Sequence, residues 1–245
     1  MRILVISDLH ANQEATSSVL VDARARGFDS AVVLGDLVGY GASPNEVVDM
    51  VRQLAPAVSV RGNHDKAACG ITSGETFNDV ARTAILWTRS ALRPDCVDYL
   101  AALPQGPLDA GGFHISHGTP LDEEDYLLGE ADARFSFESL PFEVVFFGHT
   151  HFTCAFTLMD GNPRLQIMTQ DHGSLELAPD RRYLVNPGSV GQPRDHNPNA
   201  AYAIFDTEAR RVEWHRVAYD WESARARIVG AGLPEVLGHR LVLGV

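Results

Sequence analysis

The chain has 245 residues, of which 45% are hydrophobic and 21% are charged, and its formal net charge is −12. This composition is typical of a globular protein with a large core, and the acidic charge argues against non-specific binding of nucleic acid, whose phosphates attract basic proteins. No apolar run approaches the roughly 18 residues that a membrane-spanning helix needs, so we expect no membrane-spanning segment.

The three cysteines are spread along the chain and form no CxxC pair: Cys69, Cys96 and Cys154. An odd and sparse set of cysteines is typical of a reducing compartment rather than of a disulfide framework. The apolar stretch at the N-terminus is shorter than the core of a signal peptide and is followed directly by charged residues. The sequence therefore predicts a cytoplasmic protein that begins at residue 1.

The first half of the chain alternates short apolar runs with helical patterns. The apolar runs predict buried strands over Arg2–Ser7, Ser30–Leu34 and Val58–Val60. The helical patterns cover Gln13–Arg26 and a segment from Ser43 to about Ala55, which opens with a capping-box pattern. Because parallel neighbours need crossover connections, this alternation predicts a parallel sheet. One face of a further helix is marked by Phe77, Val80, Ala84, Trp87 and Ala91.

The second half of the chain is dense in short strand patterns with Gly, Pro or Asn between them. These patterns cover Gly112–Ser116, Glu143–Phe147, Cys154–Met159, Leu165–Met168, Ser174–Leu177, Tyr183–Val185, Ala201–Phe205 and Val212–Val217. Their density predicts a second, more antiparallel sheet. The tail returns to helix from Asp220. Since no linker or repeat interrupts the chain, we expect a single domain over residues 1–245 with a helical tail at about 220–245.

Five short motifs place metal-binding side chains immediately after predicted strands. They are Asp8-Leu9-His10, Gly35-Asp36, Gly62-Asn63-His64-Asp65, Ser116-His117-Gly118 and Gly148-His149-Thr150-His151. Each motif alone is most often a turn or a solvated loop. Ligands collect at the carboxyl ends of strands in α/β sheets, and five such ends with carboxylate, amide or imidazole groups together indicate a metal centre.

The ligand types narrow the choice of metal. Imidazole and carboxylate without thiolate suit Mn²⁺, Fe, Co²⁺, Ni²⁺ or Zn²⁺, and argue against Ca²⁺ and against an iron–sulfur cluster. Two ions with about four protein ligands each need about seven side chains if one carboxylate bridges them. The chain offers Asp8, His10, Asp36, Asn63, His117, His149 and His151. Asp36 is the natural bridge because it lies between the two groups in the sequence.

The order and spacing of these motifs resemble the signature of the calcineurin-like metallophosphoesterase superfamily. Within it, the segments Gly35–Gly41 and Asn186–Arg194 resemble the YfcE-like phosphodiesterase branch. The resemblance covers roughly Met1 to Phe205. It implies an α/β fold, a four-layer α/β/β/α sandwich of two mixed sheets with a dimetal site at the carboxyl ends of the strands.

The resemblance also implies roles for single residues. One ion would be held by Asp8, His10, Asp36 and His151, and the other by Asp36, Asn63, His117 and His149. His64 matches the family's non-ligand histidine beside the leaving group, and Asp65 would orient it. Arg194 is the best candidate for a substrate contact, since a guanidinium pairs with phosphate through two hydrogen bonds, while a surface ion pair is its alternative role.

The predicted reaction is hydrolysis of a small phosphoester, with phosphodiesters favoured. Two divalent ions, Mn²⁺ first among them, would neutralise the substrate and activate a bridging hydroxide for in-line attack, while His64 protonates the leaving alkoxide. The alternatives are a phosphomonoesterase or Ser/Thr-type protein phosphatase, and a non-catalytic Vps29-like scaffold. Protein phosphatases carry an Arg soon after the GD motif, where this chain has Val38-Gly39-Tyr40, and scaffolds lose ligands that this chain keeps. The sequence leaves a homodimer open.

Overall fold

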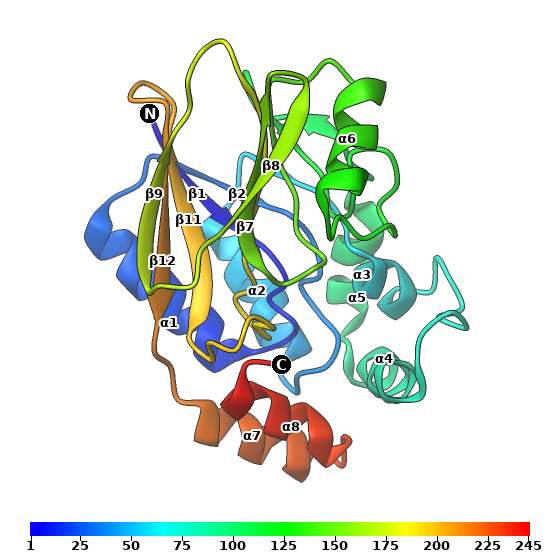
Figure 1. Cartoon of the computed structure of the whole chain (residues 1–245). Helices are drawn as coiled ribbons and strands as arrows, with labels where there is room; N and C mark the ends of the chain where they lie inside the picture. The colour runs from blue at the N-terminus through cyan, green and yellow to red at the C-terminus, as the bar shows by residue number, and fades with distance from the viewer.

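Two mixed sheets of six strands form the centre of the computed structural model, which describes residues 1–245 (Figure 1). The first sheet has the order β3 (Val58–Ser59), β2 (Ser30–Val33), β1 (Arg2–Ile6), β11 (Ala200–Asp206), β12 (Arg211–Val217) and β9 (His172–Glu176). The strands β1, β2 and β3 run parallel as predicted, and β11, β12 and β9 continue the sheet in antiparallel pairs.

The second sheet contains both parallel and antiparallel pairs. Its order is β4 (Leu108–Asp109), β5 (His114–Ile115), β6 (Val144–Phe146), β10 (Arg182–Pro187), β7 (Thr153–Met159) and β8 (Asn162–Ile167). The strands β5, β6 and β10 are parallel, whereas β4, β7 and β8 pair antiparallel. The strands of the second half of the chain are therefore shared between the two sheets, because β9, β11 and β12 extend the first one.

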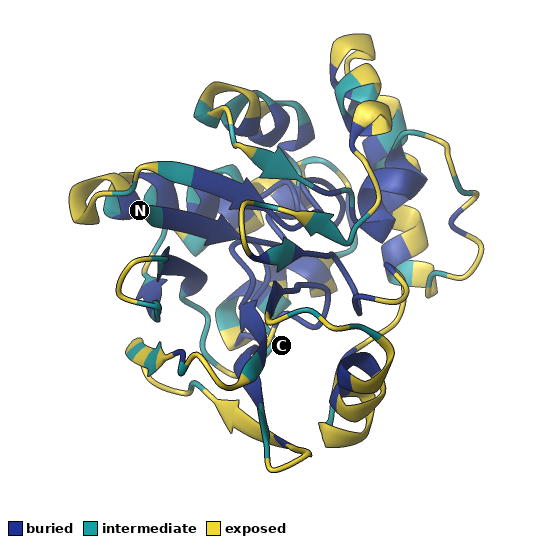
Figure 2. Cartoon of the chain, turned by 90° about the horizontal axis from the view of Figure 1, so that it is seen from above, coloured by how far each residue is buried: buried dark blue, intermediate teal, exposed yellow.

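Helices cover the outer faces of both sheets and complete the predicted four layers. On the first sheet the buried residues of β1 pack with residues of α1 (Gln13–Arg26), α2 (Pro44–Leu54) and α5 (Pro94–Ala102). On the second sheet the outer residues pack with α6 (Glu130–Ser139). The side chains of β1 alternate accordingly, since Leu4 and Ile6 face the helices while Ile3 and Val5 lie between the sheets. Figure 2 shows most of the central strands buried and the outer faces of the helices exposed, and the edge strands β8 and β9 are also largely exposed.

The remaining helices lie near the edge where the parallel strands end. They are α3 (Asn63–Ala68), α4 (Asp79–Ala91), α7 (Trp221–Gly230) and α8 (Glu235–Leu243). The two C-terminal helices form the pair at the bottom of Figure 1. Their apolar residues pack with Tyr40 and with Ala81 and Ala84 of α4. The predicted helical tail thus forms part of the wall around this edge.

Two local predictions are wrong. Ser43 makes no side-chain bond to α2, because its ψ of 55° lies outside the extended region that N-cap residues adopt, so the capping box does not form. Phe77 does not belong to α4, which begins at Asp79 behind the N-cap Asn78. No helix combines the length and the apolar character that crossing a membrane requires.

Candidate metal centre

The seven candidate ligands lie together at one edge of the two sheets. Asp8 and His10 follow β1, Asp36 follows β2, and Asn63 opens α3 behind β3. His117 follows β5 of the second sheet, and His149 and His151 follow β6. All seven are buried, with 8% exposure or less. The parallel strands of both sheets therefore deliver the polar side chains to one place, as strand order predicts.

The backbone at this edge is strained. Five of the seven residues have positive φ angles between 47° and 66°: Asp8, His10, Asp36, His149 and His151. Non-glycine residues rarely adopt this left-handed region, and it persists only where the surrounding structure enforces it. Backbone hydrogen bonds provide that constraint, for example from the Asp8 amide to the Gly35 carbonyl at 3.1 Å and from the Gly148 amide to the His117 carbonyl at 2.7 Å.

Two glycines allow the turns to approach the carboxylates. A Cβ atom on Gly62 would lie 2.0 Å from Oδ1 of Asp36. A Cβ atom on Gly148 would lie 2.0 Å from Oγ of Ser7 and 2.9 Å from Oδ2 of Asp8. Any side chain at these two positions would displace a carboxylate or its neighbour, so only glycine fits at Gly62 and Gly148.

The first group of ligand atoms comes from Asp8, His10 and His151, whose atoms lie within 4.8 Å of one another. Nδ1 of His10 donates to the Val38 carbonyl at 3.1 Å, and Nδ1 of His151 donates to the Gln192 carbonyl at 2.6 Å. Because a carbonyl can only accept, both Nε2 atoms are left as acceptors that point inward. They lie 3.1 Å apart, an arrangement that a cation between them would stabilise.

The second group comes from Asp36, His117 and His149, with Asn63 beside it. Nδ1 of His117 donates to the Leu34 carbonyl at 2.8 Å, whereas His149 uses Nε2 to donate to the Glu124 carbonyl at 3.2 Å. Nε2 of His117 and Nδ1 of His149 are thereby turned toward each other at 3.2 Å. Oδ1 of Asn63 lies 3.3 Å from Nε2 of His117, so three candidate ligand atoms converge on one point.

Asp36 connects the two groups. Its Oδ2 atom lies 3.7 Å from Nε2 of His10 and 3.4 Å from Nε2 of His117. This oxygen is buried and has no hydrogen-bond partner, whereas Oδ1 accepts the His64 amide at 2.9 Å. A buried carboxylate oxygen without a partner is costly. A divalent cation on each side would satisfy it, so the donor set fits two metal ions.

The electrostatics of the centre favour positive charge. Burial alone would lower the pKa of His117, but the Asp36 and Asp8 carboxylates raise it to about 10. Burial raises the pKa of Asp8 to about 6, and burial together with the charge of His117 lowers the pKa of His149 to about 3. The two carboxylates therefore stabilise a positive charge at this position, as a proton on His117 or a divalent cation among the ligands would supply.

His64 and Asp65 are buried beside the centre. The predicted hydrogen bond by which Asp65 would orient His64 does not form. The Asp65 carboxylate accepts the amides of Leu37 at 2.9 Å, Val38 at 3.2 Å and Gly62 at 3.0 Å. These bonds hold the two loops that carry Asp36 and Asn63 against each other. Nδ1 of His64 has no hydrogen-bond partner, and burial lowers the pKa of this imidazole to about 4.

Packing between rings positions the His64 imidazole instead. Its ring centroid lies 4.4 Å from that of Tyr40, 4.7 Å from that of Phe77 and 5.0 Å from that of His10. The structure therefore corrects the expectation that Asp65 orients His64. It also gives Phe77 a place beside the centre that its helical periodicity did not indicate.

Arg194 lies over the centre without an ion-pair partner. Its guanidinium carbon lies 5.6 Å from the centroid of the Tyr40 ring, its Nη2 donates to Oε1 of Gln192 at 3.0 Å, and its Nε is buried without a partner. The neighbouring Asp195 forms a buried ion pair with Arg216, which anchors the loop. The alternative role of Arg194 in a surface ion pair is therefore wrong, and donors of its guanidinium remain free for an anion.

Tyr126 is a residue of the centre that the sequence did not indicate. Its ring stacks on His149 with centroids 4.0 Å apart, and it is 49% exposed. The same loop supplies the Glu124 carbonyl that receives the His149 hydrogen bond. Nζ of Lys66 holds this loop through Glu123 at 2.7 Å. The loop has neither periodicity nor a motif, so only the fold reveals its position.

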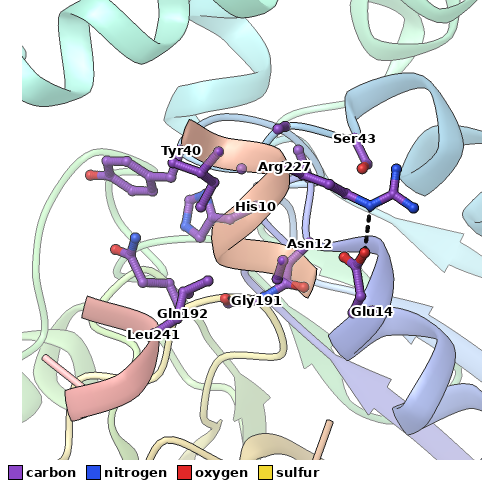
Figure 3. A pocket seen from close by; sticks show the side chains of 14 residues that line it. His10, Asn12, Glu14, Tyr40, Ser43, Gly191, Gln192, Arg227 and Leu241 are labelled. Carbon is purple, nitrogen blue, oxygen red and sulfur yellow. Dashed lines mark hydrogen bonds and ion pairs between the residues drawn. The ribbon is translucent and has the colours of Figure 1, made fainter. Parts of the chain in front are cut away.

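The C-terminal helices form a small pocket beside His10 (Figure 3). Ala224, Ile228 and Leu241 line it, and an ion pair between Glu14 and Arg227 at 2.6 Å lies at its side. Asn12 in the same wall is the N-cap of α1, with Oδ1 accepting the Ala15 amide at 3.1 Å. This side of the centre is thus closed by the tail.

Comparison with known families now identifies the class of protein. Residues 1–210 match the calcineurin-like phosphoesterase superfamily domain, and the chain belongs to this superfamily, as its motifs predicted. Membership supports the hydrolysis of phosphoric esters.

Particular relatives extend over the whole chain. A crystal structure of a metallophosphoesterase from Sphaerobacter thermophilus is 41% identical, with a TM-score of 0.90, and covers 100% of this chain and 99% of that one. The uncharacterized protein MJ0912 from Methanocaldococcus jannaschii is 40% identical over 99% of this chain and 98% of its own length. A hypothetical protein from Pyrococcus horikoshii, PH1004, shares the fold at 20% identity, with a TM-score of 0.79 and coverage of 100% and 98%.

Proposed function

We propose that the chain is a dimetal phosphodiesterase acting on a small substrate. The observation that carries the proposal is the convergence of two groups of buried ligand atoms on the unpartnered Oδ2 atom of Asp36. Each histidine of the two groups has one nitrogen bonded to a backbone carbonyl and the other directed inward. Such an arrangement fixes the tautomer and direction of a metal ligand.

The proposed ligand sets follow the two groups. Asp8, His10, Asp36 and His151 would hold one ion, and Asp36, Asn63, His117 and His149 the other. The set of imidazole, carboxylate and amide suits Mn²⁺ best in our proposal, with Fe, Ni²⁺, Co²⁺ and Zn²⁺ as alternatives. When bound, two such ions would neutralise the phosphate charge and lower the pKa of a water molecule toward ~7.

The residues around the ions would bind the phosphate and assist the leaving group. Arg194 would donate to phosphate oxygens, which its free guanidinium donors and its lack of an ion-pair partner support. The negative charge of a bound phosphate would raise the pKa of His64 from its lowered value, so that this imidazole takes up a proton and passes it to the departing alkoxide. The rings of Tyr40 and Phe77 would fix the plane of the imidazole. Asn63 would contact the substrate as well as its ion.

A diester is the better substrate class because a second cationic clamp is lacking. The segment that follows Asp36 carries no arginine. A side chain at Gly39 in this segment would collide with His64, since a Cβ atom there would lie 2.3 Å from Nδ1 of His64. Arg194 is thus the one guanidinium available to bind the phosphate. This suits a diester better than a monoester, because a monoester carries more negative charge and needs more cationic groups. The alternative is a phosphomonoesterase, which the free donors of Arg194 would support.

The chain as a whole would act as a single domain in the cytoplasm. The C-terminal helices pack on Tyr40 and α4 rather than standing apart, which supports one domain over residues 1–245. All three cysteines are free, as a reducing compartment would leave them.

The test compares bis-p-nitrophenyl phosphate with p-nitrophenyl phosphate as substrates of metal-stripped protein resupplied with Mn²⁺. We expect a preference for the diester that Asn63→Ala abolishes. A preference for the monoester would favour the phosphomonoesterase. No turnover of either ester by metal-loaded protein would contradict the proposal and favour a scaffold.

A further inference from the structure

An apolar groove is lined by residues of the β7–β8 hairpin, of the segment before it and of the loop before α6. Figure 1 shows where the β7–β8 hairpin and α6 lie in the fold. Seven of its eight lining residues are hydrophobic. They are Leu127, Leu128, Phe152, Cys154, Phe156, Leu165 and Ile167, with Thr150 as the eighth. Its rim is open to water, since Leu128 is 62% exposed and Ile167 is 53% exposed. An open groove with an apolar lining suits the binding of an apolar group.

Residues that line the groove are chain neighbours of the candidate metal ligands. Thr150 lies between the two candidate ligands His149 and His151, and Phe152 follows directly. On the opposite wall, Leu127 and Leu128 follow Tyr126, whose half-exposed ring stacks on His149. A substrate held at the metal centre therefore has this groove as the neighbouring surface.

The chemistry of the groove selects a hydrocarbon group. No charged side chain lines it, and its single hydroxyl, that of Thr150, already accepts from Nδ2 of Asn186 at 3.0 Å. A nucleobase or a sugar placed there would lose hydrogen bonds to water without replacement, which is unfavourable. An alkyl or phenyl group would lose nothing of this kind and would remove apolar surface from water.

The groove lies on a different side of the centre from His64. The His64 ring is packed against His10, Tyr40 and Phe77, whereas the groove is lined by Thr150 and Leu127, the chain neighbours of His149 and Tyr126. We infer that the apolar groove binds the hydrocarbon substituent that stays on phosphorus when the other ester bond of a phosphodiester is cleaved. This inference rests on the proposed phosphodiesterase function and names the class of its substrate.

The test uses a series of methyl, butyl and octyl p-nitrophenyl phosphate diesters, which share one leaving group and differ in the retained group. We expect kcat/KM to rise along the series by about threefold to fourfold for each methylene group that is buried. Ile167→Asp, at an exposed position of the rim, should remove this dependence on chain length. The matched control is Val21→Asp on α1, where the side chain is 65% exposed, and it should keep the dependence.

Equal kcat/KM values along the series, or a dependence that survives in both Ile167→Asp and Leu128→Asp, would overturn the inference. If no diester is hydrolysed, the proposed function fails, and calorimetry with methyl and octyl phosphate decides the inference by itself. Tighter binding of octyl phosphate that Ile167→Asp removes would support the groove, and equal binding would overturn it. A dimer that Ile167→Asp dissociates, with the chain-length dependence unchanged, would assign the groove to a contact between copies of the chain.

Discussion

The two flanks of the metal centre differ in how they are closed. The flank at His10 is walled by the rings of Tyr40, His64 and Phe77 and by the C-terminal helices behind Tyr40. The flank at His149 carries one half-exposed ring, that of Tyr126, and the next residues along the chain, Thr150 and Leu127, line the apolar groove. A walled flank suits a proton donor that must keep one orientation, and an open apolar flank suits a variable part of the substrate.

The largest expected effect concerns the walled flank. His64→Ala should keep the metal content and lower kcat by about 10²–10⁴-fold for esters with alkyl leaving groups, because such alkoxides need a proton. Nitrophenyl esters should lose much less, since nitrophenolate leaves without protonation. The measurement is kcat against the pKa of the leaving group. An equal loss for both kinds of ester would assign His64 a role other than proton donation.

A substitution of Arg194, whose guanidinium lies over the Tyr40 ring, should have the second largest effect on activity. Arg194→Gln should lower kcat/KM by about 10- to 100-fold, since a hydrogen bond to a charged group contributes ~1.5–3 kcal/mol. Arg194→Lys keeps the charge but not the forked geometry and should give an intermediate loss. Steady-state kinetics on a phosphodiester measures both. Unchanged kcat/KM in the Gln variant would remove Arg194 from the substrate site.

The open flank should respond least. Tyr126→Ala should weaken metal binding or kcat/KM by about two- to tenfold, because a stacked ring pair contributes ~0.5–1.5 kcal/mol. Tyr126→Phe keeps the ring and is the matched control, with values expected near those of the original chain. Metal titration and steady-state kinetics of both variants measure the contribution of the Tyr126 ring. A loss of equal size in the Phe variant would show that the hydroxyl matters rather than the stacking.

The sequence predicts the ligand residues of the centre better than the residues that surround them, for a physical reason. Residues such as Asp36 and His149 stand directly after strands, so strand order alone brings them together. Tyr126 and the groove depend on how a loop without a motif folds back across β7 and β8. The roles of Asp65 and Phe77 depend on hydrogen bonds and ring contacts that no spacing encodes.

Prediction of the fold from the sequence is limited in the same way, because local patterns do not carry long-range contacts. The helices with clear periodicity or caps, such as α1 and α4, were predictable, whereas α3, α5 and α6 were not indicated. The first residues of α3 are Asn63, His64 and Asp65, which the chemistry of the site selects rather than helix propensity. The division of the later strands between two sheets depends on long-range pairing, as between β1 and β11, which local patterns do not carry.

The most direct test of the central claim is the number of metal ions bound per chain. Mn²⁺-loaded protein, freed of excess metal, should contain two ions per chain by elemental analysis. Asp36→Asn should contain fewer than one, because the unpartnered oxygen that faces both groups is lost, while Asp79→Asn at an exposed helix start should keep two. One ion in the original chain, or two in Asp36→Asn, would contradict the account of Asp36 as the shared ligand of a dimetal centre.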